Sequence, residues 1–322
     1  MRSSGQRGAV AAPAYRSQPV RSRFVRSEHE KPIKKGQNSR TAESAAAFRA
    51  SHFLYAQHRV FEDPYALALT SRGWRAVLSS RASNWLVFSR ALRKLKPIVA
   101  QVLGRSRFAE DALASAMGRG INQYVIVGAG LDSYALRRPD PAGKLRVFEV
   151  DHPDTQRAKR QRLGFLGIAL PDHLEFVAID FELQELSEAM KGSSHRRDTP
   201  AFYSWLGTTH YLTPQATLAT LRSIARCAAP GSEVVLDYSV PLGLIDSDEQ
   251  RDLLWVAKRA RRMGEPLIGN LDPVQLHADV AQLGYEIVED LAAPEQARRY
   301  FSNRTDGLEP TQVSRLLHLR LP

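Results

Sequence analysis

Glycines and acids that follow short apolar runs are the residues of this chain best suited to chemistry. In QYVIVGAGLDSYALRRP an apolar run is followed by Gly128 and Gly130, with Asp132 just behind them. Asp151 comes 21 positions after Gly130, and Asp180 follows the apolar run FVAI. In an open parallel sheet, ligands bind outside the carboxyl ends of the strands, and an acid at about this spacing binds a ribose hydroxyl. The pattern therefore predicts a site for a ribose-containing ligand.

The acids also indicate which ligand this is. A dinucleotide fingerprint has a third glycine or an alanine where this chain has Ser133. Its pyrophosphate lies at the helix N-terminus, where Asp132 brings a second negative charge. Like charges in a partly desolvated pocket cost on the order of several kcal/mol. S-Adenosyl-L-methionine has a ribose, an adenine and a cationic sulfonium but no phosphate, so we expect it as the cofactor. A nicotinamide-dependent oxidoreductase is the alternative enzyme.

Three more residues at the strand ends are candidate cofactor ligands. Asp180 can accept a hydrogen bond from the adenine amino group, and Phe181 offers a ring for stacking. Alternatively, Asp180 caps a helix that begins at Phe181. Glu149 shares a strand face with Asp151, because side chains two apart point the same way. It either binds the ligand or is a solvated strand end.

The elements that would position these residues follow from the hydrophobic pattern. Residues 41–120 have helical patterns, which predict an N-terminal helical layer. From residue 123 onward, strand-like runs alternate with helical ones, as expected for an α/β fold with a doubly wound, mostly parallel sheet of about seven strands. The expected strands are 124–128, 145–150, 174–179, 201–206, 232–239, 285–291 and 313–321, and the expected helices between them are 152–167, 181–191, 213–229 and 246–264.

Charge and cysteine content limit the partners. Residues 1–40 hold ten Lys and Arg against two Glu, so they carry +8 of the formal +11 and leave +3 for the rest. This composition predicts a basic disordered tail. The tail is either an extension that results from an over-long start-site assignment, an arm that binds a phosphate-rich partner, or an organelle transit peptide. The nearly balanced remainder makes nucleic acid an unlikely partner of the folded part. With one cysteine, no metal-ligand spacing and no long apolar run, we expect a cytoplasmic protein without metal or membrane contact.

The ordered motifs carry a family resemblance. QYVIVGAGLDSYALRRP, VFEVDHPDTQRAKRQRL, FVAIDFE, SWLGTTHYLT and APGSEVVLDYS together resemble the leucine carboxyl methyltransferase-like family. Its bacterial branch includes S-adenosyl-L-methionine-dependent methyltransferases and polyketide O-methyltransferases. The resemblance implies a class I methyltransferase fold over residues 41–322, with a helical cap at 41–120 and the cofactor-binding sheet at 121–322. It also implies methyl transfer to a carboxylate or hydroxyl of a small molecule.

The resemblance assigns roles by motif. Gly128 resembles the contact to the methionine part, Asp151 the ribose ligand, and the pair Asp180 and Phe181 the adenine contact. The arginines expected at the cofactor carboxylate are Arg49 and Arg105, with Arg107 as the alternative to Arg105; a guanidinium fork suits a carboxylate.

One position departs from the family pattern. The eukaryotic branch has a glutamate where this chain has Leu206, which cannot hydrogen-bond the cofactor. The departure favours the bacterial small-molecule branch over the protein-phosphatase branch.

On the acceptor side, we expect Tyr203, His210 and Tyr211 to line the pocket, with His210 as a general base. A hydroxyl acceptor needs such a base, whereas a carboxylate does not. Alternatively, all three residues pack or cap. A further alternative is a non-catalytic module that binds the cofactor and uses its basic tail to bind nucleic acid.

Overall fold

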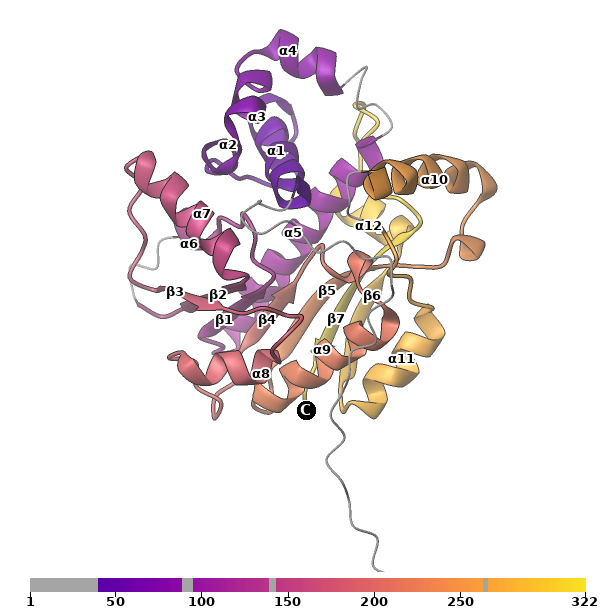
Figure 1. The fold of residues 1–322 in the computed structure, drawn as a ribbon. Helices are drawn as coiled ribbons and strands as arrows, with labels where there is room; N and C mark the ends of the chain where they lie inside the picture. Colours follow the sequence, from indigo (N-terminus) through magenta and orange to yellow (C-terminus); the bar gives the residue numbers. More distant parts are fainter. Residues whose placement is uncertain (1–39, 89–94, 139–142, 263–265) are drawn as a thin grey trace, which may run out of the picture. The chain divides into compact units, whose positions relative to one another are not determined.

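The computed structural model describes residues 40–88, 95–138, 143–262 and 266–322 of the chain (Figure 1). By its internal contacts the chain divides after Ile33, and all described residues belong to the second unit, Lys34–Pro322. The tail predicted over residues 1–40 lies outside the described residues, except for Arg40, which begins the first helix.

A seven-stranded sheet forms the centre of this unit, in the order β3-β2-β1-β4-β5-β7-β6. Its strands are β1 (Gln123–Val127), β2 (Arg146–Asp151), β3 (Leu174–Ala178), β4 (Phe202–Trp205), β5 (Glu233–Ser239), β6 (Glu286–Leu291) and β7 (Ser314–Arg320). The pairs that link β1 to β5 are all parallel, while β7 runs antiparallel to both of its neighbours. The predicted α/β class with a mostly parallel sheet is confirmed. The strand order reverses beside β1, so the carboxyl ends of β1 and β4 form the switch point, where such sheets bind ligands.

Helices cover both faces of the sheet because its central strands are apolar on both sides. On one face, Val125 and Val127 of β1 pack with α8 (Leu186–Ala189), α9 (Pro214–Cys227) and α11 (Pro273–Gln282). On the other face, Tyr124 and Ile126 pack with α5 (Lys96–Gly118) and α6 (Tyr134–Arg137). Figure 1 shows α8, α9 and α11 together on one side of the strands and α5 on the other. The other α-helices that the structure describes after β1 are α7 (Pro153–Phe165), α10 (Ser247–Arg262) and α12 (Ala293–Tyr300).

The described residues before β1 are helical or loop. They form α1 (Arg40–Tyr55), α2 (Ala66–Leu69), α3 (Arg72–Val77), α4 (Arg81–Leu86) and α5. The buried face of α1 consists largely of small residues, including Ala46, Ala47 and Ala50. These let α1 pack closely on α2 and α5. Within this layer α5 packs directly on the sheet, and α1 is joined to α7 by the pair of Glu43 and Arg162 at 2.8 Å.

The helix predicted over residues 246–264 corresponds to α10, whereas the helix predicted after β3 differs from the structure. No helix spans residues 181–191: the amides of Leu183 and Gln184 bond the carbonyl of Asp180 in a single turn that does not continue, and α8 begins only at Leu186. The prediction also omitted α11 and α12. The signal for α11 was present, because Asp272 accepts the amides of Val274 and Gln275, a typical N-cap followed by proline.

Candidate functional site

The glycine loop after β1 lies at the switch point. Gly128 and Gly130 have φ of +69° and +51°, the left-handed region that glycine adopts without steric cost. A Cβ at Gly128 would lie 2.9 Å from the hydroxyl of Thr208, which follows β4. A Cβ at Gly130 would lie 3.3 Å from that of Ala42 in α1. The two glycines thus let three segments meet closely where a ligand would bind.

Asp151, at the end of β2, faces this loop. Its carboxylate accepts the amide of Gly130 at 2.5 Å and that of His152 at 2.6 Å. Burial raises the pKa of Asp151, and the two backbone amides oppose that shift. Each carboxylate oxygen has two lone pairs, so these bonds fix the orientation of the group and leave acceptor sites over. The geometry suits a donor such as a ribose hydroxyl.

Glu149 is not a solvated strand end, and that alternative was wrong. Its side chain is 2% exposed and is paired with Lys159 of α7 at 2.5 Å. Burial raises the pKa of Glu149 to about 7, although Lys159 lowers it. Lys159 also donates to the carbonyl of Asp132 at 2.6 Å, so the pair of Glu149 and Lys159 fixes the backbone of the glycine loop. Lys159 was missed in the sequence analysis. It lies four residues before Leu163, so both side chains share one face of the predicted helix, and this was the signal that Lys159 is buried.

Asp132 lies two residues before the first residue of the short helix α6. Its carboxylate accepts the amide of Tyr134 at 2.7 Å, and the residue is half-buried. Asp180 and Phe181 lie at the end of the next strand. Asp180 accepts the amide of Glu182 at 3.0 Å, so it caps a turn rather than the helix expected at Phe181. The side chain of Phe181 is 39% exposed, as a stacking surface requires.

Arg49 reaches the glycine loop from α1. Its Nε donates to Asp63 at 2.8 Å, and its Nη2 donates to the carbonyl of Leu131 at 2.7 Å. The carboxylate of Asp63 also lies 3.7 Å from Arg137. Arg49 therefore fixes the backbone of the loop and is buried while doing so.

Arg105 lies on the other side of the switch point, on α5. Its Nη1 donates to Asp237 of β5 at 2.9 Å, and its guanidinium packs so closely on Gly207 that a Cβ there would overlap it. Asp237 is fully buried and also accepts the amide of Gly207 at 2.6 Å. Burial alone would raise the pKa of Asp237, but Arg105 and His210 outweigh it and hold that pKa well below its ordinary value. Asp237 is the central residue that sequence reasoning missed.

His210 joins the same group. It follows β4 in the turn Thr209–Tyr211 and is 7% exposed. Its Nε2 lies 3.0 Å from Asp237, and its Nδ1 lies 2.8 Å from the hydroxyl of Ser239. The carbonyl of His210 accepts the amides of residues 268 and 269 at 3.0 and 2.9 Å, which fixes the turn. Tyr211, beside it, bonds Thr41 of α1 at 3.3 Å.

Tyr203 does not lie with His210, and its expected place in an acceptor pocket was wrong. It is fully buried inside β4. Its hydroxyl is 3.2 Å from His195, which precedes β4, and 3.9 Å from the sulfur of Cys227 at the end of α9. Burial raises the pKa of this hydroxyl well above its ordinary value. Tyr203 thus belongs to the core on the α9 face, because strand side chains alternate and Ser204 faces the other way.

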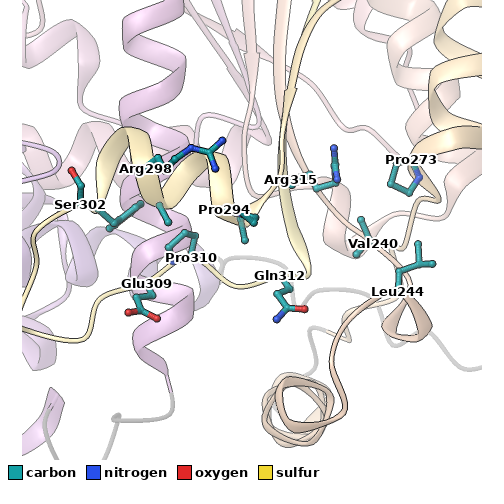
Figure 2. A pocket seen from close by; sticks show the side chains of 14 residues that line it. Val240, Leu244, Pro273, Pro294, Arg298, Ser302, Glu309, Pro310, Gln312 and Arg315 are labelled. Carbon is teal, nitrogen blue, oxygen red and sulfur yellow. The ribbon is translucent and has the colours of Figure 1, made fainter.

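A hollow of about 640 Å³ lies past the carboxyl end of β5. Most of its lining is apolar, and it includes Val240, Leu244, Pro273 and Phe301. Figure 2 shows Arg298 and Arg315 among the side chains that line it. Phe301 packs on Gly104 of α5, so one wall of the hollow contacts the helix that carries Arg105.

The family model described as leucine carboxyl methyltransferase matches residues 42–225, more than half of the chain. The chain belongs to this family. It is 27% identical over 301 residues to the "Putative S-adenosyl-L-methionine-dependent methyltransferase YktD" of Bacillus subtilis, covering 89% of this chain and 99% of that protein. It is 28% identical over 219 residues to a protein of the same description from Mycobacterium marinum, covering 67% and 72%. As a family member, the chain is an S-adenosyl-L-methionine-dependent methyltransferase. The nicotinamide alternative is therefore set aside.

Solved structures agree on the fold. A methyltransferase from Thermobifida fusca superposes with a TM-score of 0.53 at 17% identity, over 86% of this chain and 94% of that one. A DUF574 family protein from Streptomyces avermitilis has a TM-score of 0.54 at 14% identity, over 87% and 97%.

Two features of the described residues concern a membrane and a metal ion as partners. None of the described helices combines the length and apolarity needed to cross a bilayer. Within the same ranges, no group of three or more His, Cys, Asp and Glu is arranged to hold a metal ion.

Proposed function

We propose that this methyltransferase acts on an oxygen atom of a small molecule. The family description itself names a carboxyl acceptor, and oxygen is also the atom of a hydroxyl acceptor. The observation that carries the proposal is the buried group of Arg105, Asp237 and His210 beside the glycine loop. It brings a cation, an anion and an imidazole to the carboxyl ends of β4 and β5, where the acceptor would meet the cofactor.

The residues at the switch point fit the cofactor. We assign the ribose hydroxyls to Asp151, whose carboxylate is already oriented by backbone amides. We assign the adenine to Asp180 and to the exposed ring of Phe181. The glycine loop, with φ of +69° at Gly128, lets the backbone approach the methionine part.

The charged residues around the loop take different parts. Arg105 is the candidate for the cofactor carboxylate, because a guanidinium has five N–H groups and its Nη1 bonds Asp237. Arg49 and the pair of Glu149 and Lys159 position the loop, since they bond the carbonyls of residues 131 and 132. Asp132 adds negative charge where the sulfonium approaches.

When bound, the cofactor supplies an electrophilic methyl group. The protein's contribution is then mainly to hold acceptor and donor in line, which can supply about 7–11 kcal/mol of the barrier. We further propose that residues 41–322 act as one methyltransferase domain in which residues 41–120 cover the site. A cytoplasmic location and the absence of a nucleic-acid partner stay predictions from the sequence.

The test uses the purified full chain. Calorimetry with S-adenosyl-L-methionine, and with NAD as the control ligand, measures the cofactor preference. Incubation of the protein with methyl-labelled cofactor and a small-molecule cell extract then shows where the methyl group goes. We expect label on oxygen, either as a methyl ester, which alkali cleaves to methanol, or as a methyl ether, which it does not. Label found exclusively on nitrogen, sulfur or carbon would contradict the proposal.

A further inference from the structure

A line of hydrogen bonds runs from Ser239 through His210 to Asp237. The hydroxyl of Ser239 lies 2.8 Å from Nδ1 of His210, and Nε2 of His210 lies 3.0 Å from Oδ2 of Asp237. Ser239 and Asp237 are two apart on β5, so their side chains share the face toward α5. His210 comes from the turn after β4. Two neighbouring strands therefore build the line at the switch-point edge of the sheet.

The contacts of Asp237 set the direction in which this line carries a proton. Its carboxylate accepts the Arg105 guanidinium at 2.9 Å and the Gly207 amide at 2.6 Å, which favours the ionised form. An ionised carboxylate can only accept, so the contact with Asp237 places hydrogen on Nε2 of His210. The side-chain amide of Gln101 also lies 3.0 Å from this nitrogen, and it meets that hydrogen with its oxygen when the amide is turned over. Nδ1 then has a free electron pair and accepts the hydroxyl of Ser239. The His210 imidazole can thus act as a base, and its unprotonated nitrogen, Nδ1, faces the hydroxyl of Ser239.

Burial shows which end of the line a substrate can reach. Asp237 is 0% exposed and His210 is 7% exposed, whereas Ser239 is half-buried. The accessible end is therefore Ser239. The residue after it, Val240, lines the largely apolar hollow of about 640 Å³ seen in Figure 2. Arg315, whose partner in the ladder is Tyr238, lines it as well, so the hollow lies at the end of β5 that carries Ser239.

A line of residues that accepts a proton is useful for only one of the two kinds of methyl acceptor, carboxylate and hydroxyl. A carboxylate is already ionised near neutral pH and gives up no proton on methylation. An alcohol or phenol must lose its proton in or around the transfer, and a base within hydrogen-bond reach speeds that loss. A base prepared by Asp237 is thus useful for a hydroxyl and superfluous for a carboxylate.

We propose that the acceptor is a hydroxyl group on a largely apolar small molecule, and that Ser239 is the catalytic residue that receives its proton. As the bond from the acceptor oxygen to the methyl carbon forms and the carbon–sulfur electron pair stays on sulfur, the hydroxyl proton passes to Oγ of Ser239. The serine's own proton passes to Nδ1 of His210, and Asp237 stabilises the resulting imidazolium. Release of that proton to water restores the line. The proposal rests on the proposed O-methyltransferase function.

The activity test compares Ser239→Ala with Ser314→Ala. Ser314 is the residue of β7 directly opposite Ser239 in the ladder. It is fully buried and its hydroxyl has no hydrogen-bond partner in the structure, so its loss removes a hydroxyl but none of the hydrogen bonds of the line. With methyl-labelled cofactor and cell extract, we expect alkali-stable ethers from the wild type. Ser239→Ala should form them about 100-fold more slowly, the lower end of a general base's contribution, while Ser314→Ala should be unaffected. Alkali-labile esters as the main product, or equal rates for the two variants, would overturn the proposal.

A second measurement does not depend on activity. In ¹⁵N-histidine-labelled protein, with the His210 signal assigned by its loss in His210→Gln, we expect hydrogen on Nε2 and none on Nδ1. Asp237→Asn should abolish that preference, since the amide can also donate. Hydrogen on Nδ1 in the wild type would refute the proton path even if labelled ethers are formed. If the tautomer is as expected but no extract compound is labelled on oxygen, the proposed function fails, and the hydroxyl assignment fails with it.

Discussion

Replacing Asp237 by asparagine tests whether this carboxylate organises the site. The side chain keeps its shape but loses its charge, so Arg105, whose side chain is 12% exposed, is left without its partner at 2.9 Å. Removing one member of a buried ion pair costs about 3–5 kcal/mol, because the other charge stays desolvated. The side-chain NH2 of the new asparagine is a donor, and it would face Arg105 and His210, which are also donors. We therefore expect a large loss of stability.

Urea denaturation of the full chain measures the effect. For a slope of about 3 kcal/mol/M, as expected for a large single domain, the midpoint should fall by about 1–2 M with little change in slope. The matched control is Asp111→Asn, which breaks an exposed pair with Arg107 on the same helix. Exposed pairs at this spacing contribute about 0.3–0.5 kcal/mol, so this midpoint should hardly move. Equal shifts for both variants would refute the idea that Asp237 carries the buried network.

The pH dependence supplies a second check. The pKa of Asp237 in the folded protein is held below its ordinary value of 3.8. A depressed carboxyl pKa stabilises the fold fully at pH above the unfolded value, and this contribution is lost as the pH falls through the folded value. The difference between wild type and Asp237→Asn should therefore be constant near neutral pH and shrink only in acid below 3.8. A difference that disappears near neutrality would assign the effect to another group.

Three further variants test the cofactor loop and its supports. Asp151→Asn should weaken S-adenosyl-L-methionine binding about 100-fold in calorimetry, because the amide offers a donor where both backbone amides and a ribose need acceptors. Gly207→Ala should lower the thermal midpoint, because φ is +72° there, which costs about 1–2 kcal/mol, and the methyl group displaces Arg105. Lys159→Met should cost more stability above pH 7 than below it, because the pKa of Glu149 is about 7 and its protonated form needs no cation.

Each of these variants has a contrasting outcome. Retained affinity in Asp151→Asn would remove the ribose assignment. Gly243→Ala is the control for Gly207, because a Cβ there meets nothing within 4 Å; an equal loss in both would exclude displacement of Arg105 as the cause. A penalty in Lys159→Met that is the same at all pH values would show that Glu149 is not the group left uncompensated.

Local patterns were sufficient to predict that the glycine loop and Asp151 lie together. Gly128 and Asp151 each follow a short strand, and parallel pairing of β1 with β2 then brings their ends together. That pairing follows from the alternation of strands and helices, which has few solutions. The same reasoning failed for Tyr203, because the face of β4 on which it lies depends on which helix covers that face.

The proposed acceptor side depends on contacts between residues far apart in the chain. Asp237 bonds Arg105, which is 132 positions earlier, and His210, which is 27 positions earlier. The sequence did hold a weak signal, since an acid and a serine interrupt an otherwise apolar strand, and buried polar groups need partners. It could not say which partners, because that depends on how α5 crosses the sheet.

The sequence by itself determined the class of fold, the family and the strand ends at which the candidate cofactor residues lie, because periodicity and spacing act over short distances along the chain. Tertiary structure alone decided that Glu149 pairs with a lysine under the loop and that Ser239, His210 and Asp237 form one line. The physical reason is that a buried polar group is satisfied by whichever groups packing brings within about 3 Å, however distant they are in the chain.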